Sequence, residues 1–240
     1  MKILVTICAR GGSKGIPKKN IKPLNNTPLI NYSINNAKQI KDKWGAEIII
    51  SSDCEEILKK GELMGIETEY KRPDFLSGDE AGKIDTIKHA LLYKEKKHSI
   101  TFDYLIDLDV SSPLRNIFDI EKGFNILLED IEMISLFSVN LANRNPYFNM
   151  VEKNKKTGYY EVIKSPDKII MSRQKANKVY DMNASFYWYR RSFFDQNYKS
   201  PITEKSGIYE MDHICFDLDH ILDFKYMDYL LKNDELDFIL

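Results

Sequence analysis

The stretch KILVTICARGGSKGIPKKN (Lys2–Asn20) joins a short apolar segment to a loop that is rich in glycine and basic residues. The segment Lys2–Ala9 is almost continuously apolar, which is typical of a strand buried on both faces of a parallel sheet. The loop Arg10–Asn20 follows at the carboxyl end of that strand, where backbone N–H groups and cations can meet a chain of phosphates. A solvated turn is the alternative. The order of the glycines excludes a Walker P-loop and a G-x-G-x-x-G dinucleotide fingerprint.

Strand-like and helix-like segments alternate after this loop. Because strands separated by about ten or more helical residues need parallel crossovers, we expect an open, doubly wound, mostly parallel α/β sheet over the first 140 residues. We expect the whole chain, residues 1–240, to form a single domain. The expected elements are a helix begun by Thr27-Pro28 and ending near Trp44-Gly45, helices at 55–64 and around 84–91 and 117–127, and strands at 46–53, 66–70, 103–109 and 133–139.

The alternation breaks near Asn140, and residues 140–182 are predicted to form an inserted excursion. Within it, YYEVIKS (159–165) and DKIIMSR (167–173) have the pattern of a β-ribbon joined by a Ser-Pro-Asp turn. The aromatic, alternating segment Asn183–Arg190 predicts a further strand, and Ile221–Leu231 predicts a closing helix. Aromatic residues in such a strand indicate sheet packing more often than a ligand platform, although alternate members can face a pocket.

Composition excludes several classes of protein. The 35 Lys and Arg residues against 36 Asp and Glu residues give a formal net charge of −1, so no global field favours nucleic acid or lipid as a partner. No apolar run approaches the roughly 20 residues that cross a bilayer. The three cysteines, Cys8, Cys54 and Cys215, are few and far apart, which predicts a cytoplasmic protein without disulfides. Cys8 is expected to be an inert core residue. No zinc spacing or serine hydrolase elbow is present.

Two acidic pairs, Asp107-Leu108-Asp109 and Asp217-Leu218-Asp219, are candidate metal ligands. Residues two apart on a strand project from one face, with about 6.6 Å between Cα atoms. Carboxylates so placed can share a Mg²⁺ ion that also binds substrate phosphates. Helix capping or surface charge is the alternative, since the pattern is short and common. Together, a cationic loop and a metal-holding pair are what nucleotidyl transfer requires, so the combination indicates a nucleotide polyphosphate.

Four motifs resemble those of one known family, the acylneuraminate cytidylyltransferases or CMP-nonulosonic acid synthetases. ARGGSKGIPKKN (Ala9–Asn20) resembles their signature A-R-x-x-S-K-G-x-x-x-K-N, and the resemblance runs from residue 3 to about 224. It implies a Rossmann-like nucleotidyltransferase that transfers CMP from CTP to the anomeric hydroxyl of a nonulosonic acid and releases pyrophosphate, for bacterial surface glycoconjugates. The other motifs, in the family's order, are KRPDFLSGDEA (71–81) for R-P-x-x-L-x-x-D, SSPLR (111–115) for T-S-P-L-R, and FDLD (216–219) for I-D-I-D.

The resemblance also implies roles for individual residues, and it requires the glycine loop and the FDLD segment to converge on one cleft. The implied catalytic residues are Arg10, Lys19 and Asp217, with Asp217 as the base. The implied CTP-binding residues are Arg10, Gly11, Ser13, Lys14, Lys19, Asn20, Arg72, Asp79, Ala81 and Lys83. The implied sugar-binding residues are Asp109, Ser111, Arg115, Arg173, Gln174, Asn183 and Tyr187. The implied ligands of the essential Mg²⁺, for which Mn²⁺ can substitute, are Asp217 and Asp219, with Asp109 as a further candidate.

The family is typically a homodimer in which a β-ribbon reaches the neighbouring subunit's site, and residues 140–182 resemble that ribbon. Arg173 is then expected to act in trans on the sugar carboxylate, for which a planar bidentate donor is well matched. Two departures resemble the bacterial branch that acts on legionaminic-type sugars. Asp109-Val110 replaces the Gln-Pro of many sialic acid enzymes, and NPYFNM (145–150) lacks their lysine after the proline.

Two other readings stay open. One is a nucleotidyltransferase of different specificity, such as a KDO (octulosonate) cytidylyltransferase or a sugar-phosphate guanylyltransferase. Against it, the KDO enzymes tend to have S-x-R-L-P-G-K where this chain has Ser13–Pro17, and the hexose-phosphate enzymes favour G-x-G-T-R. The other is a non-catalytic nucleotide-binding homologue. The intact Lys19, Asp217 and Asp219 argue against that reading.

Overall fold

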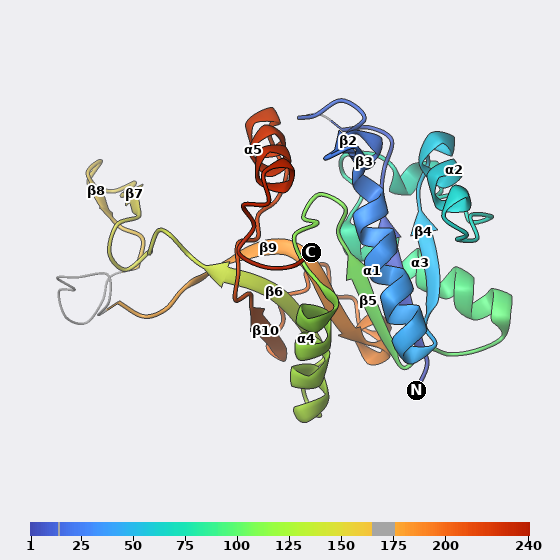
Figure 1. Ribbon diagram of the computed structural model, residues 1–240. Coiled ribbons are helices and arrows are strands. Elements are labelled where there is room, and N and C mark those ends of the chain that lie inside the picture. The colour runs from blue at the N-terminus through green and yellow to red at the C-terminus, as the bar shows by residue number, and fades with distance from the viewer. Residues whose placement is uncertain (14, 165–175) are drawn as a thin grey trace.

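The computed structural model describes residues 1–13, 15–164 and 176–240, and its centre is a six-stranded sheet (Figure 1). The strands lie in the order β10-β6-β9-β5-β1-β4. All of them run in one direction except β9, which is antiparallel to both of its neighbours. The sheet is therefore mostly parallel, as predicted. Its strands are β1 (Ile3–Cys8), β4 (Glu47–Ser51), β5 (Tyr104–Leu108), β6 (Ser135–Leu141), β9 (Tyr180–Arg190) and β10 (Ser206–Glu210).

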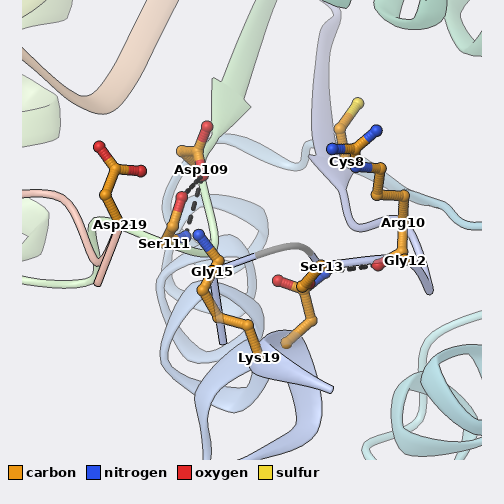
Figure 2. A pocket seen from close by; sticks show the side chains of 10 residues that line it. Cys8, Arg10, Gly12, Ser13, Gly15, Lys19, Asp109, Ser111 and Asp219 are labelled. Atoms are coloured by element: carbon orange, nitrogen blue, oxygen red, sulfur yellow. Dashed lines mark hydrogen bonds between the residues drawn. The ribbon is translucent and has the colours of Figure 1, made fainter. Parts of the chain in front are cut away.

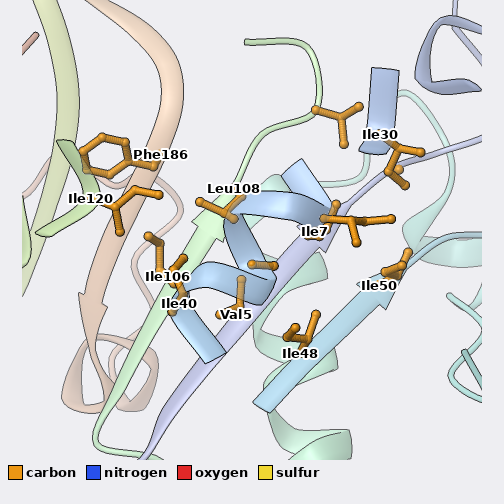
Figure 3. Packing of buried hydrophobic residues seen from close by; sticks show 14 of the residues in the cluster. Val5, Ile7, Ile30, Ile40, Ile48, Ile50, Ile106, Leu108, Ile120 and Phe186 are labelled. Atoms are coloured by element: carbon orange, nitrogen blue, oxygen red, sulfur yellow. The ribbon is translucent and has the colours of Figure 1, made fainter. Parts of the chain in front are cut away.

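Helices cover both faces of this sheet, which confirms the doubly wound α/β class. Successive side chains of a strand point to opposite faces, so Val5 and Ile7 pack on the face that α1 and α4 cover, with α1 against β1, while Leu4 packs with α3. Figure 3 shows the first of these layers, where Ile40 of α1 lies over β1 and β5. No helix in the described part of the chain has the length and apolar character to span a membrane. The helices are α1 (Leu29–Trp44), α2 (Glu55–Leu63), α3 (Lys83–His98), α4 (Ile117–Glu129), α5 (Ile221–Lys232), and the short 3-10 helices η1 (Lys19–Ile21), η2 (Asp74–Leu76) and η4 (Arg191–Asp195).

The structure corrects three sequence predictions about elements. Thr27 does not cap α1: Thr27–Pro28 form β3, which pairs with β2 (Pro23–Leu24), and Pro28 is the N-cap. The segment 66–70 is not a strand. Its alternation arises because Ile66 packs into the hydrophobic cluster on the α1 side of the sheet and Tyr70 packs into the cluster on the α3 side, where its hydroxyl lies 2.8 Å from Nδ1 of His89. Strand β10, which was not predicted, closes the sheet beside β6.

The excursion begins where β6 and β9 continue beyond the other strands, and it extends away from the body of the protein (Figure 1). In it, β7 (Val151–Lys153) pairs antiparallel with β8 (Tyr160–Val162). The sequence predicted a ribbon here, but it paired YYEVIKS with the segment that follows. The observed partner of β8 precedes it, and the whole of the ribbon's expected second strand, DKIIMSR (167–173), lies outside the described residues. Tyr159 and Tyr160 are 79% and 71% exposed.

Candidate active site

A cleft of about 310 Å³ opens at the carboxyl ends of β1 and β5. These neighbouring parallel strands lie where the chain crosses first to one side of β1 and then to the other, which is where open α/β sheets bind ligands. Figure 2 shows the loop after β1 facing Asp109 and Ser111 after β5, with Asp219 at the side of the cleft. The lining residues are Cys8, Arg10, Gly12, Ser13, Gly15, Lys19, Asn20, Asp109, Ser111 and Asp219.

The glycine loop and the FDLD segment touch, so the expected convergence is confirmed. The Lys19 ammonium donates a hydrogen bond of 2.8 Å to the carbonyl of Leu218. A Cβ added at Gly15 would lie only 2.2 Å from the carbonyl oxygen of Asp219, so only glycine allows this approach. The Leu218 N–H donates to the carbonyl of Ser111. The three motifs are therefore held together by backbone contacts.

A second pocket of about 290 Å³ adjoins the first and shares Cys8, Arg10 and Asp109 with it. Arg72 is buried beneath it, and its guanidinium donates to the hydroxyl and carbonyl of Ser51 at the end of β4. The two adjoining pockets, which we call the groove, extend from the glycine loop to the start of α3 and share one wall. The other residues that line the second pocket are Arg72, Leu76, Gly78, Asp79, Ala81, Lys83 and Thr86.

Arg10 links the two pockets. Its guanidinium forms an ion pair with Asp79 at 2.8 Å, and its carbonyl accepts a hydrogen bond from the Asn20 side chain, which ties the start of the loop to its end. Gly11 does not line the cleft, because its N–H donates to the Asp53 carboxylate on the other side. The Arg10 guanidinium therefore lies where a phosphate can approach it, whereas the Gly11 N–H already donates a hydrogen bond to Asp53 and is not available to a ligand.

Lys83, the first residue of α3, holds the acidic pair at the end of β5. Its ammonium lies 3.0 Å from Asp107 and 2.6 Å from Asp109, and 4.5 Å from the ring centroid of Tyr187. The two aspartates were expected to be able to share a Mg²⁺ ion; in the structure they instead share the Lys83 ammonium. Asp107 is fully buried and also accepts from the Thr6 hydroxyl.

The charges of this cluster set its protonation states. Burial raises the pKa of Asp109, but the Lys83 ammonium and the Ser111 N–H and hydroxyl outweigh it and bring that pKa down to about 2. Burial lowers the pKa of Lys83, yet Asp107 and Asp109 hold it well above its usual value. Burial raises the pKa of Tyr187 to about 12. At neutral pH the lysine and Asp109 are therefore charged and the tyrosine is neutral.

We expect Lys83→Met to destabilise the fold by about 2 kcal/mol at pH 7, because it leaves buried carboxylates without their counterion. The lowered pKa of Asp109 means that its pairing stabilises the fold above its unfolded pKa of 3.8 and is lost as the pH falls towards 2. Urea unfolding at several pH values should show this loss in the parent protein and a smaller one in the variant. Lys96→Met, exposed on the same helix, is the control; equal stability of both variants at pH 7 would contradict the assignment.

The FDLD segment has no regular secondary structure, so its aspartates are not placed by a strand as expected. Asp219 is exposed at the cleft, whereas Asp217 is half-buried, and its Oδ1 atom is buried without a hydrogen-bond partner among the described residues. Burial, and then the charge of Asp109, raise the pKa of Asp217. A carboxylate oxygen left in this way fits a position that a cation completes.

The described residues contain no group of three or more His, Cys, Asp or Glu side chains that could by itself hold a metal ion. Mg²⁺ does not require one, since it is usually bound through one or two carboxylates together with substrate phosphates and water. Asp219 lines the cleft, whereas Asp217 lines neither pocket and lies half-buried two residues before it, so Asp219 is the carboxylate that meets a bound phosphate directly. Asp109 is less suited, because both of its oxygens already accept hydrogen bonds from Lys83 and Ser111.

Arg115 does not reach the cleft, so the structure contradicts a direct contact between it and a sugar. The side chain is fully buried. Its guanidinium donates to the carbonyls of Asp109, Ser112 and Ser185 and to the hydroxyl of Ser33. Burial lowers its pKa to about 10, which leaves it charged at neutral pH. Arg115 therefore holds the loop after β5 against α1 and β9.

The remaining predicted residues divide into two groups. Asn183 is buried and lines neither pocket, because its side chain bonds to Ser138, Ser185 and Asn140 around an irregularity in the pairing of β6 with β9. Tyr187 lies beneath Lys83 and also lines neither pocket. Lys14, Arg173 and Gln174 lie outside the described residues.

Cys8 is the residue that the sequence prediction misplaced. It lines both pockets, instead of lying inert in the core. Burial raises the pKa of its thiol, so it is a neutral wall of the cleft. Its position as the last residue of the strand before the glycine loop could have predicted that it faces the cleft, because ligands bind at the carboxyl ends of such strands.

Comparison with known proteins assigns the chain to a family. A family model described as "Cytidylyltransferase" matches residues 4–234. The chain belongs to the cytidylyltransferase family. Among the relatives of this cytidylyltransferase is the post-translational flagellin modification protein B of Campylobacter coli, which is 42% identical over 98% of this chain and 97% of its own length. The CMP-N,N'-diacetyllegionaminic acid synthase of Campylobacter jejuni is 40% identical over 96% of this chain and 95% of its own.

Among solved structures, a CMP:2-keto-3-deoxy-manno-octonic acid synthetase in complex with CTP superimposes with a TM-score of 0.69. It covers 98% of this cytidylyltransferase and 100% of its own chain at 18% identity. At that identity the likeness concerns the fold alone. The family and the fold class expected from the motifs are thereby confirmed.

Proposed function

We propose that this cytidylyltransferase transfers CMP from CTP to the anomeric hydroxyl of a nonulosonic acid and releases pyrophosphate. The observation that carries the proposal is the contact of the basic glycine loop with the FDLD segment across a groove that continues to Arg72 and Ala81. The groove therefore has a cationic and carboxylate-bearing end for a triphosphate with its metal, and a second end for a nucleoside. The relative named as a CMP-N,N'-diacetyllegionaminic acid synthase, similar over nearly the whole chain, supports the sugar class.

Each end of the groove supplies a part of the reaction. Arg10, Ser13 and Lys19 line the end where the β- and γ-phosphates would lie, and their charges and donors stabilise the leaving pyrophosphate. Arg72, Ala81 and Thr86 line the pocket for cytosine and ribose. The anomeric oxygen attacks the α-phosphorus, and the bond from that phosphorus to the bridging oxygen breaks. The hydroxyl proton passes to a carboxylate, and we assign that role to Asp217.

The metal of this proposal is Mg²⁺, and Asp217 and Asp219 are the residues that would hold it. Bound there with the triphosphate, it would withdraw charge from the phosphate under attack. The lone Oδ1 of Asp217 supports this assignment. Lys19, hydrogen-bonded to the carbonyl between the two aspartates, would keep the segment turned towards the cleft.

We infer that the acceptor is of the legionaminic type. Where many sialic acid enzymes have a neutral glutamine, this chain places Asp109 in the wall shared by both pockets. Its carboxylate is fixed by Lys83 and Ser111, so it can accept a hydrogen bond from a sugar hydroxyl or amide at a defined position. We therefore expect the rate to differ most between sugars that differ in the hydroxyl or amide group facing Asp109.

We also propose that the protein is a homodimer and that residues 140–182 carry the contact. The described part of this excursion projects from the body and exposes apolar side chains (Figure 1). Among them, Val151, Tyr159 and Tyr160 lie on or beside the paired strands β7 and β8, and a second subunit would cover them. Sedimentation of the parent protein and of Tyr160→Asp would test the proposal, and a monomeric parent protein would refute it.

The function is tested by incubating the protein with CTP, Mg²⁺ and one sugar at a time. The panel contains sialic, legionaminic and pseudaminic acids and KDO, and released pyrophosphate is measured. We expect release that requires both the metal and a nonulosonic acid, fastest with a legionaminic acid. Release with KDO alone would favour the alternative specificity, and a nucleotide competition panel would reveal a guanylyltransferase. Binding of CTP without release from any sugar would favour a non-catalytic homologue.

A further inference from the structure

A buried histidine lies outside the groove, at the start of the segment that carries Asp217 and Asp219. Nε2 of His213 is 3.0 Å from the carboxylate of Asp119 in α4, and Nδ1 is 3.0 Å from the carbonyl oxygen of Ile214. The ring stacks on Phe238 with 3.5 Å between centroids. The side chains of His213 and Asp119 are 7% and 5% exposed.

The contacts of His213 require its charged form. A carbonyl oxygen and an ionised carboxylate oxygen can only accept hydrogen bonds, so each ring nitrogen must donate. Neutral histidine has one N–H and would turn a lone pair towards one of the oxygens. The Asp119 carboxylate also accepts from the Tyr209 hydroxyl and the Asn116 N–H, which leaves its charge to be balanced by the ring. The geometry therefore corresponds to an imidazolium.

Every group that faces His213 favours this state. Burial lowers its pKa, but the hydrogen bonds to Asp119 and to the Ile214 carbonyl outweigh it and raise that pKa above 6.5. Asp237, from the C-terminal segment, accepts from the Ile214 N–H and adds a negative charge. Asp212, the neighbour in sequence, is paired with Lys122 on the surface.

The histidine is connected to the aspartates through a short, irregular length of chain. From residue 211 to 219 no helix or strand holds the backbone. The Asn140 side chain donates to the carbonyl of His213, the Ser112 hydroxyl donates to that of Phe216, and Lys19 donates to that of Leu218. His213 is therefore one of a series of attachments that begins with the Met211 N–H bonded to the carbonyl of Val139, and its strength depends on the protonation of the imidazole.

We propose that protonated His213 is a positioning residue for the aspartate segment: its ion pair with Asp119 fixes the backbone that carries Asp217 and that places Asp219 at the cleft. The inference rests on the proposed function only for the role of those two aspartates. Loss of the proton leaves Asp119 buried without a counterion and loosens the segment. The metal concentration needed for half-saturation then rises as the pH rises through the pKa of His213.

The test compares His213→Gln and Asp119→Asn with the parent protein. Glutamine keeps one donor for Asp119 but carries no charge, and asparagine keeps the acceptor for the Asn116 N–H. The half-saturating Mn²⁺ concentration is measured by electron paramagnetic resonance on CTP-loaded protein from pH 6 to pH 9. We expect His213→Gln to raise this half-saturating concentration about tenfold near pH 6. Residues that orient metal ligands typically change metal affinity by about 10- to 100-fold, and this is the lower end of that range. The ratio to the parent should fall towards one at pH 9.

Two further measurements complete the test. The imidazole protons of His213, identified by their loss in His213→Gln, should titrate above pH 6.5 in the parent and at lower pH in Asp119→Asn. His98→Gln, an exposed site on α3, should leave metal affinity unchanged. A ratio that stays constant with pH, or a His213 that titrates at or below 6.5, overturns the proposal. Because neither readout uses a sugar, a failure of the proposed reaction would be seen separately in the pyrophosphate assay.

Discussion

Asp219→Asn should lower kcat about a thousandfold while CTP still binds, since charge stabilisation by a metal is worth several kcal/mol and each 1.36 kcal/mol is tenfold in rate. Asp219 is exposed at the cleft beside Gly15, so the amide causes no steric change and little change in stability. Pyrophosphate release measures the rate, and calorimetric titration with CTP and Mg²⁺ measures binding.

Asp212→Asn is the matched control, because Asp212 lies in the same segment but pairs with Lys122 at the surface. It should keep the parent rate to within about twofold. An Asp219→Asn protein that turns over at the parent rate would show that this carboxylate holds no essential metal. If the affinity for CTP fell by the same factor as the rate, Asp219 would contribute to the binding of CTP and not specifically to the transition state.

Arg115→Ala should destabilise the protein by about 3–5 kcal/mol, with a fall in Tm of roughly 10 °C. The substitution leaves the carbonyls of Asp109, Ser112 and Ser185 without their shared donor inside the protein. Each unsatisfied buried acceptor costs about 1–3 kcal/mol. Urea unfolding and calorimetry measure the change.

The control is Lys59→Ala, at an exposed site on α2, which should change stability by less than about 0.5 kcal/mol. The comparison also separates two roles for Arg115. A residue that contacted the sugar would raise KM for the sugar and leave Tm unchanged. That result would contradict the buried position of the guanidinium.

Sequence reasoning predicted the alternation of elements well, because the signals are local. Val5 and Ile7 in a continuous apolar run, and the helical spacing of Ile30, Ile34 and Ala37, needed no distant partner to be recognised. The segment 66–70 shows the limit of that method. Buried and exposed residues do alternate there, but the segment pairs with no strand: Ile66 and Tyr70 pack into the two hydrophobic clusters.

The residues of the site were predicted less evenly. Arg10, Lys19 and Asp219 lie in the cleft as the motifs implied. Arg115 stands in an equally recognisable motif and yet is buried, because a motif records which residues occur together and not whether they face a ligand or the core. The sharing of Lys83 by Asp107 and Asp109 could not be read from spacing, since the lysine comes from another element.

The sequence by itself determined the α/β class, the glycine loop after the first strand and the family, since these depend on residues that are neighbours along the chain. Only the tertiary structure decided which charges meet. Lys19 and Leu218 are 199 residues apart and form a hydrogen bond because the ends of β1 and β5 lie side by side. Periodicity shows which face of an element is buried. The position of one element against another follows from the packing of all of them, which no single segment encodes.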